Sequence, residues 1–358
     1  MSNKGYTVAV TADLHATNNL YLAKPTSEGY TDRLLDVNHV LDIVLSDKSV
    51  IDVLILGDLY HNRLLDAPTL KKIGRTFEDH GDKNIYILPG NHDAHDAFGQ
   101  HYNVDYLDNR NINVLNEGDA LEFSNTTLIA LPYLPDRKAK EIIQQLRGDV
   151  LLCHQSFVGC RNNGWVNKFG IEVKDYDHFN YVLSGHFHES QEFHKGMYVG
   201  SPLPLSFQES NNKGYWLITF DNGQVIHKEF QPIKSPEFRT TEIKGCHNAK
   251  GLLEVLEALA KDKVYVHLHI IVNAGDVNTQ KAALNTVSDK LPENVRMLTW
   301  TITQADTQKA IPTASEMAAL PTIESMLDKY MVEVSGLSDE DKKQAWQIGM
   351  DILGEARS

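Results

Sequence analysis

The chain has 358 residues, of which 42% are hydrophobic and 23% are charged. These values are ordinary for a globular protein of about two domains, and they exclude a disordered tail and a small disulfide-rich domain. Because no run approaches about 18 apolar residues, we expect no membrane-spanning segment. The formal net charge of −14 is the opposite of the basic balance typical of a free-standing nucleic-acid binder.

Cysteine and histidine usage narrows the class of protein. The three cysteines, Cys153, Cys160 and Cys246, show no CxxC spacing, and the first residues run into a strand-like pattern instead of a secretion signal. We therefore expect a cytoplasmic protein. Of the 16 histidines, 13 precede residue 228, and several stand beside Asp, Asn or Gly at the ends of apolar runs.

The first 150 residues alternate short β-branched runs with helical patterns. This βαβα order predicts an α/β fold with parallel strands. The expected elements, in chain order, are a strand at 6–11, a helix near 32–45, a strand at 53–56, a helix near 67–80 and a strand at 85–88.

Strand patterns continue to residue 230 with fewer helices between them. The last two expected strands, 215–220 and 224–230, are joined by the turn Asp221-Asn222-Gly223, so we expect this half to be more antiparallel. The other expected strands are 127–131, 150–153, 181–184 and 196–199.

A proline-punctuated stretch at 231–236 predicts a linker, so the first domain is expected to span residues 1–235. Residues 236–312 are predicted to form a compact α/β module and residues 313–358 a helical segment. The expected elements of the module are a helix near 249–260, a strand at 264–272, a helix near 279–290 and a strand at 295–301.

Two short amphipathic helices are expected at the end of the chain, one opening near Ser315 and one at Ser338, which Asp341 helps to cap. A narrow apolar stripe on short helices does not bury itself well alone, so we expect a partner surface. The alternative is that the helices pack on their own module. The expected partner-binding residues are Ile323, Leu327, Tyr330, Met331, Trp346, Met350 and Leu353.

Five short motifs stand directly after predicted strands, where an open α/β sheet presents its ligand-binding loops. Their side chains are oxygen and nitrogen donors, which suit Mn²⁺, Fe or Zn²⁺ better than Ca²⁺ or an Fe–S cluster. The glycines within them permit close backbone turns. The motifs are Asp13-Leu14-His15, Gly57-Asp58-Leu59-Tyr60-His61, Gly90-Asn91-His92-Asp93, His154 and Gly185-His186-Phe187-His188.

Each motif alone has a plainer explanation. Asp13 can cap the next helix, His154 can be a satisfied buried histidine, and His61 can simply pack against a neighbour. His186 and His188 are more specific, because alternate residues of an extended segment point the same way. The complete set, in this order and always at a strand end, favours a metal centre.

The set resembles the pattern of the calcineurin-like metallophosphoesterases, in which D-x-H, G-D, G-N-H-D/E, H and G-H-x-H follow one another. The resemblance implies a two-sheet sandwich flanked by helices, and two divalent cations, most often Mn²⁺, that share Asp58. It assigns Asp13, His15 and His188 to one cation and Asn91, His154 and His186 to the other. It places His92 at the phosphate, as an acid or charge stabiliser, with His61 as a second catalytic candidate.

Two such cations, about 3.5 to 4 Å apart, hold phosphate oxygens and lower the pKa of a bound water. An imidazole can then protonate the departing oxygen. This chemistry defines a reaction type, phosphoester hydrolysis, and leaves the substrate open.

Around Asp58 the sequence is similar to the G-D-L-F-H motif of SbcD-type nuclease subunits, whereas protein phosphatases carry G-D-x-V-D-R. The resemblance implies a small capping domain that faces DNA, a C-terminal segment that docks on the coiled coil of an SbcC-type ABC ATPase, and a homodimer through helices following Asp58 and His92. The compact length looks most like bacteriophage versions of the T-even type, which implies the host cytoplasm. The implied role is DNA end processing in recombination, repair and replication.

Loops beside the metal motifs offer weaker candidates for DNA contact. Basic and amide side chains can bind phosphates, and a tryptophan can stack on an unpaired base. Each of these residues is equally at home in a solvated loop. They are Lys24, Arg33, Asn62, Arg63, Arg161, Asn162, Trp165 and Lys168.

The sequence thus predicts a Mn²⁺-dependent DNA nuclease subunit that degrades duplex ends and cuts single strands or hairpins. The alternatives are a phosphatase or nucleotide phosphodiesterase of the same superfamily, and an idle scaffold subunit. Residues 1–235 contain 21 Lys and Arg against 30 Asp and Glu, residues 236–312 are neutral, and residues 313–358 have a net charge of −5. Bound cations would attract phosphate locally, but we expect the chain alone to hold DNA weakly.

Overall fold

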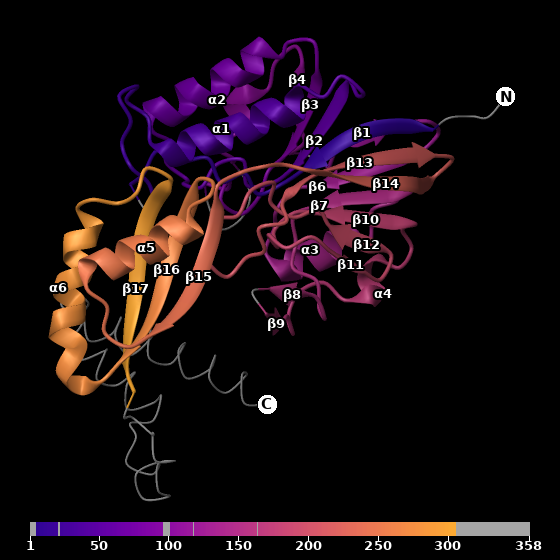
Figure 1. Cartoon of the computed structure of the whole chain (residues 1–358). Coiled ribbons are helices and arrows are strands. Elements are labelled where there is room, and N and C mark those ends of the chain that lie inside the picture. Colours follow the sequence, from indigo (N-terminus) through magenta and orange to yellow (C-terminus); the bar gives the residue numbers. More distant parts are fainter. Residues whose placement is uncertain (1–4, 21, 96–100, 117, 163, 306–358) are drawn as a thin grey trace, which may run out of the picture. The chain divides into compact units, whose positions relative to one another are not determined.

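The computed structural model describes residues 5–20, 22–95, 101–116, 118–162 and 164–305 (Figure 1). Residues 1–303 group into one compact unit. The predicted helices near Ser315 and Ser338, and the partner-binding residues on them, lie outside the described residues. Within the described part of the chain, no helix has the length and apolar character needed to cross a membrane.

The first sheet has six strands in the order β14-β13-β1-β2-β3-β4. Strands β1 to β4 pair in parallel, and β13 pairs antiparallel with both β1 and β14. Figure 1 shows helices α1 (Asp32–Leu45) and α2 (Ala67–Asp79) side by side on one face. The strands are β1 (Tyr6–Thr11), β2 (Asp52–Leu56), β3 (Asn84–Leu88), β4 (Ile112–Val114), β13 (Gly214–Asp221) and β14 (Gln224–Pro232).

The second sheet also has six strands, in the order β11-β12-β10-β7-β6-β5. Helices α3 (Asp136–Ile143) and α4 (Val173–Tyr176) lie against its outer face. The strands are β5 (Ala120–Glu122), β6 (Thr127–Leu131), β7 (Val150–Cys153), β10 (Tyr181–Ser184), β11 (Gln191–Phe193) and β12 (Gly196–Tyr198).

The prediction that the second half of the sandwich is more antiparallel is correct only in part. Antiparallel pairs do occur there, between β5 and β6, between β11 and β12 and around β13. The inner strands β6, β7, β10 and β12 nevertheless pair in parallel. The short helices α3 and α4 separate β6 from β7 and β7 from β10 and so allow parallel crossovers.

The two sheets pack face to face, and alternate residues of each inner strand serve different cores. In β1, Val8 and Val10 face the core between the sheets, while Ala9 faces α1 and α2. In β7, Val150 and Leu152 face that central core and Leu151 faces α3. Both faces of these strands are buried, which explains their continuous apolar runs.

A third sheet of three strands, β15-β16-β17, is covered by helices α5 and α6 and has a separate hydrophobic core. The sequence missed β15 (Glu237–Lys244) because polar residues alternate along it, and the predicted linker shrinks to residues 233–236. The division at residue 235 stays a prediction. The other elements of this module lie close to their predicted bounds. They are α5 (Ala249–Leu259), β16 (Val264–Val272), α6 (Val277–Ser288) and β17 (Val295–Gln304).

The remaining elements are short. A two-stranded hairpin is formed by β8 (Arg161–Asn162) and β9 (Trp165–Val166), and η2 (Ala274–Asp276) precedes α6. Of the two helices expected to form a dimer interface, the one after Asp58 is α2. Among the described residues between His92 and β4, the chain forms only the 3₁₀ turn η1 (Asp105–Leu107) instead of a second α-helix.

Candidate metal centre

All five predicted motifs meet at one edge of the sandwich. Asp13, Asp58 and Asn91 follow β1, β2 and β3 of the first sheet, and His154 and His186 follow β7 and β10 of the second. These five strands run parallel within their sheets, so their carboxyl ends bring the loops together. The structure therefore brings the predicted motifs together.

The backbone of these loops is unusual. Asp13, His15, Asp58 and His186 have φ angles of 54°, 49°, 52° and 95°, in the left-handed region that side chains with a Cβ disfavour. Neighbouring loops hold the first three in place, because the amides of Asp13 and His15 donate to the carbonyls of Gly57 and Asp58, each over 2.9 Å. Strain concentrated at functional side chains is typical of active sites.

Two positions must be glycine because predicted ligand side chains pack directly against their backbone. A Cβ on Gly57, whose φ is 93°, would lie 2.0 Å from Nδ1 of His154, and a Cβ on Gly90 would lie 2.2 Å from Oδ1 of Asp58. No side chain fits at either position without displacing a predicted ligand. These contacts confirm the expectation that the motif glycines permit close packing.

Asp58 lies at the middle of the cluster, and its side chain is almost fully buried. Its Oδ2 atom is 3.5 Å from Nε2 of His15 and 3.3 Å from Nε2 of His154. One carboxylate thus stands between two imidazoles that come from different sheets.

Further donors gather on each side of Asp58. On one side, Nε2 of His15 is 3.2 Å from Nε2 of His188, and an oxygen of Asp13 lies within 4.8 Å of a ring nitrogen of each histidine. On the other side, Oδ1 of Asn91 is 3.1 Å from Nε2 of His154 and 2.9 Å from Nδ1 of His186.

These separations suit shared cations. Ligand atoms bound to one ion at about 2.1 Å lie roughly 3.0 to 3.5 Å apart when the angle between them is near octahedral or tetrahedral. The donor set contains carboxylate, amide and imidazole groups, as such ions require. The structure therefore contains a candidate dimetal site, and the assignment of each ligand to one cation stays a prediction.

Burial and mutual charge set the protonation of the donors. Burial raises the pKa of Asp13 to about 6. Burial would raise that of Asp58 too, but the nearby imidazoles of His154 and His15 hold the pKa of Asp58 well below its usual range. Burial lowers the pKa of His15 strongly and that of His186 to about 3. Both of these rings are therefore neutral at physiological pH and have a lone pair for a cation.

Hydrogen bonds on the far side of the rings fix which nitrogen faces the centre. Nδ1 of His154 lies 2.8 Å from the carbonyl oxygen of Leu56, so Nδ1 must donate and Nε2 is the nitrogen that faces the centre. Nδ1 of His188 likewise lies 3.1 Å from Oε1 of Glu209. The ring of His186 has Asn91 at Nδ1 and the Ser156 hydroxyl 3.0 Å from Nε2.

The sequence prediction missed two buried carboxylates that hold this site. Glu209 contacts His188 and forms an ion pair with Lys213 at 3.0 Å, but no strand-end motif marks it. Asp93 belongs to a predicted motif without a predicted role. It accepts from the amides of Gly90 and Tyr60, over 2.9 and 3.1 Å, and so ties two site loops together.

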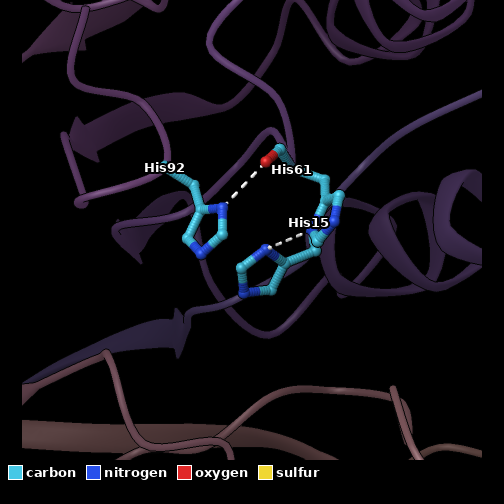
Figure 2. A group of neighbouring side chains, drawn as sticks. All are labelled: His15, His61 and His92. Carbon is cyan, nitrogen blue, oxygen red and sulfur yellow. Dashed lines mark hydrogen bonds between the residues drawn. The ribbon is translucent and has the colours of Figure 1, made fainter. Parts of the chain in front are cut away.

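His61 and His92 stand at the edge of the cluster, next to His15 (Figure 2). Nδ1 of His92 donates to the carbonyl of His61 over 2.8 Å, and the two rings stack with centroids 5.2 Å apart. The amide of His92 donates to Oδ1 of Asp58 over 2.8 Å. With Nδ1 engaged, Nε2 is the atom of His92 that can exchange a proton with a substrate.

Most of the residues predicted to contact DNA are exposed. Lys24, Asn62 and Arg63 lie in loops near the metal centre, and Arg161, Asn162, Trp165 and Lys168 lie on or beside the β8–β9 hairpin. Trp165 is 81% exposed, so its ring is open to solvent. DNA contact by these residues stays a prediction.

Arg33 differs from the rest of this group. It lies on α1, is only 7% exposed, and donates to the carbonyl of Pro204 over 2.6 Å. Its guanidinium also lies over the rings of Phe238 and Tyr265. These contacts favour a structural role for Arg33 over the predicted loop contact with DNA.

Comparison with known proteins agrees with this geometry. The family model described as calcineurin-like phosphoesterase matches residues 6–190. Exonuclease subunit 1 of Enterobacteria phage T4 is 21% identical over 293 residues, which cover 80% of each chain.

Two solved structures are also similar. A dimetal phosphatase from Danio rerio has a TM-score of 0.40 and 11% identity, over 61% of this chain and 94% of that one. A purple acid phosphatase from yellow lupin (Lupinus luteus) seeds has a TM-score of 0.31 and 13% identity, over 64% and 46% of the two chains.

The Glu209 contacts generate a testable pH dependence. Burial opposes ionisation of Glu209, but the hydrogen bond from His188 and the charge of Lys213 lower its pKa from 4.5 to about 2. A carboxyl whose pKa is lower in the folded state stabilises the fold above its ordinary pKa, and this stabilisation is lost as the pH falls toward 2. We expect Glu209→Gln to reduce the free energy of unfolding most at pH 5 and above, with the difference from the wild type about 2 kcal/mol smaller at pH 3 than at pH 5.

Urea denaturation of the chelator-treated protein at several pH values measures this difference. Glu254→Gln, which changes an exposed carboxylate on α5, is the matched control and should leave the pH dependence unchanged. Parallel stability curves for the wild type and Glu209→Gln would contradict the assigned role.

Proposed function

Because the chain belongs to the calcineurin-like phosphoesterase family, we propose that it is a metal-dependent DNA nuclease that hydrolyses phosphodiester bonds. The observation that supports this most is the set of oxygen and nitrogen donors around the buried carboxylate of Asp58. The similarity to a phage exonuclease subunit over 80% of the chain favours DNA over a protein or small-molecule substrate.

The donors fit two divalent cations, and we propose Mn²⁺ as the natural metal. Asp13, His15 and His188 would hold one cation, Asn91, His154 and His186 the other, and Asp58 both. When bound, such a pair orients phosphate oxygens and lowers the pKa of a water molecule, so that hydroxide is available to attack phosphorus. His188 is held for this task by Glu209, and His154 by the carbonyl of Leu56.

His92 is the proposed acid of the reaction. Its Nδ1 is engaged with the carbonyl of His61, so a proton on Nε2 can pass to the departing oxygen of the phosphodiester. His61 stacks on His92 and contacts His15, which places a second imidazole at the same edge. The pKa of His61 is lowered, chiefly by burial, so this ring is neutral and suits contact with substrate by hydrogen bonding.

The proposed substrates are duplex ends, degraded exonucleolytically, and single strands or hairpins, cut endonucleolytically. Exposed residues near the centre and on the β8–β9 hairpin, among them Lys24, Arg63, Arg161 and Lys168, are proposed to contact the DNA backbone. With a net charge of −14, the chain alone should bind DNA weakly. A second candidate function, a phosphatase or nucleotide phosphodiesterase, uses the same centre without the DNA contacts.

A partner subunit would supply the further DNA contacts that tight binding needs. We propose that the chain is the nuclease subunit of an SbcC–SbcD-type complex, in which residues 313–358 dock on the coiled coil of an ABC ATPase. A homodimer through α2 is proposed as well, with roles in recombination, repair and replication.

Nuclease activity is tested with the pure full-length chain, Mn²⁺, a blunt DNA duplex and p-nitrophenyl phosphate. We expect DNA cleavage that His92→Ala lowers about 10²- to 10⁴-fold, the usual effect of losing an acid–base group, without loss of bound metal. His194→Ala, which changes a histidine paired with Asp177 instead of the centre, is the control. Hydrolysis of the small ester alone, even with the ATPase present, would contradict the nuclease and favour the phosphatase.

Docking of the C-terminal segment is tested by co-purification with the ATPase. Replacing Tyr330 and Met331 with Asp places charges on the predicted apolar stripe and should release the ATPase while bound metal is retained. Lys329→Glu, off the stripe, should leave the complex intact. Retention of the complex by the double variant would contradict the docking, and sedimentation of the pure chain as a monomer would contradict the dimer.

A further inference from the structure

A cavity of about 820 Å³ adjoins the candidate metal centre. His15, His61, His92 and His188 line one end of it. The wall beyond the histidines is largely apolar, with Leu20, Leu22, Leu205, Phe207 and Met297, and it also includes Arg33, Gln208 and other polar side chains. This cavity therefore joins the histidines to a wall in which apolar side chains stand beside hydrogen-bonding groups.

The aromatic wall of the cavity is fixed in place. The ring of Phe207 packs edge-on against Phe238, with centroids 4.9 Å apart, and lies 5.7 Å from the ring of His267. The loop before it is held by Arg33, which donates to the carbonyl of Pro204 over 2.6 Å. Phe207 thus presents a preformed apolar surface, which lowers the entropic cost of binding a planar group.

The strand that forms the opposite wall is tied to α1. Arg296, the neighbour of Met297 on β17, pairs with Asp32 at 2.9 Å and with Asp36 at 3.4 Å. Nζ of Lys24 also donates to the carbonyl of Val295 over 3.4 Å. All these residues belong to the same compact unit, so the cavity lies within that unit.

Little negative charge faces the cavity. Glu209 is the one acidic residue that lines it, and its carboxylate is already engaged by His188 and by Lys213 at 3.0 Å. Glu209 therefore adds little repulsion toward an anionic ligand, and the apolar side chains of the wall suit a planar ring.

We propose that this cavity binds the sugar and base of one unpaired nucleotide while its phosphodiester lies over the histidines. The proposal rests on the proposed function and specifies its substrate. The volume falls in the size range of small-ligand sites, roughly 300 to 1,000 Å³, which suits one or two nucleotides of a single strand better than a duplex. Cleavage then requires the strand to be unpaired at the cut, as at a frayed end, a hairpin loop or a single strand.

The test compares two esters with the same p-nitrophenol leaving group on the full-length chain with Mn²⁺. One is the p-nitrophenyl ester of thymidine 5′-monophosphate, which carries a nucleoside, and the other is methyl p-nitrophenyl phosphate, which has only a methyl group in its place. We expect Phe207→Ala to raise KM for the nucleoside ester about 5- to 100-fold, the range for losing one base–aromatic contact, and to change that for the other ester less than twofold. Phe207→Leu should fall between Phe207→Ala and the wild type.

Phe169→Ala, which removes an equally large ring that is 74% exposed and does not line the cavity, is the matched control. Equilibrium dialysis of thymidine 5′-monophosphate and of inorganic phosphate gives a second readout that needs no turnover. Phe207→Ala should weaken binding of the nucleotide and leave that of phosphate unchanged.

The outcomes separate the two proposals. Equal effects of Phe207→Ala on both esters, or no effect on either ester or on nucleotide binding, would overturn the nucleotide cavity. If the wild type hydrolyses neither ester and leaves DNA intact, the proposed function fails, and the dialysis still decides whether the cavity selects a nucleoside.

Discussion

The structure depends on the burial of like charges at one point. The carboxyl groups of Asp13, Asp58 and Asp93 are almost fully buried at the edge where the two sheets meet. Neighbouring carboxylates in a medium of low dielectric constant repel one another and need compensating positive charge. Part of it comes from His154, whose pKa is lowered by burial but raised more by Asp58 and Asp13, to about 9 in the chain without metal. Two cations would supply the rest of the compensating positive charge. The cluster that destabilises the fold without metal is therefore suited to phosphate chemistry.

The sandwich is the scaffold that makes this concentration of charge tolerable. Parallel strands from both sheets end at one edge, so each loop contributes one or two donors and no loop has to hold the centre alone. The left-handed backbone at Asp13, His15 and Asp58 costs on the order of 1 to 2 kcal/mol per residue, offset by hydrogen bonds between neighbouring loops. Hydrogen bonds from behind, such as that of Glu209 to His188, then fix the direction in which each ring presents its lone pair.

Much of this was predictable from the sequence because the strongest signals are local. Strands buried on both faces give continuous apolar runs, so β1, β2 and β7 were predicted close to their observed bounds. Polar motifs at the strand ends mark the place where the seven predicted donors come together, and their role as ligands stays a prediction. What the sequence did not reveal depends on contacts between distant segments. The amphipathic strand β15 has no continuous apolar run, Glu209 has no motif, and the burial of Arg33 under Phe238 follows only from tertiary packing. The cavity beside Phe207 likewise depends on distant segments, since Phe207 packs against Phe238 of β15 and Arg296 of β17 pairs with Asp32 and Asp36 of α1.

Anomalous scattering from crystals grown with Mn²⁺ tests the central claim, that Asp58 joins two cations, most directly. We expect two peaks on either side of the Asp58 carboxylate, one among Asp13, His15 and His188 and the other among Asn91, His154 and His186. In crystals of Asp58→Asn both peaks should weaken together, because both cations lose the shared charge. A single peak, or two peaks of which only one responds to Asp58→Asn, would contradict a shared dimetal centre.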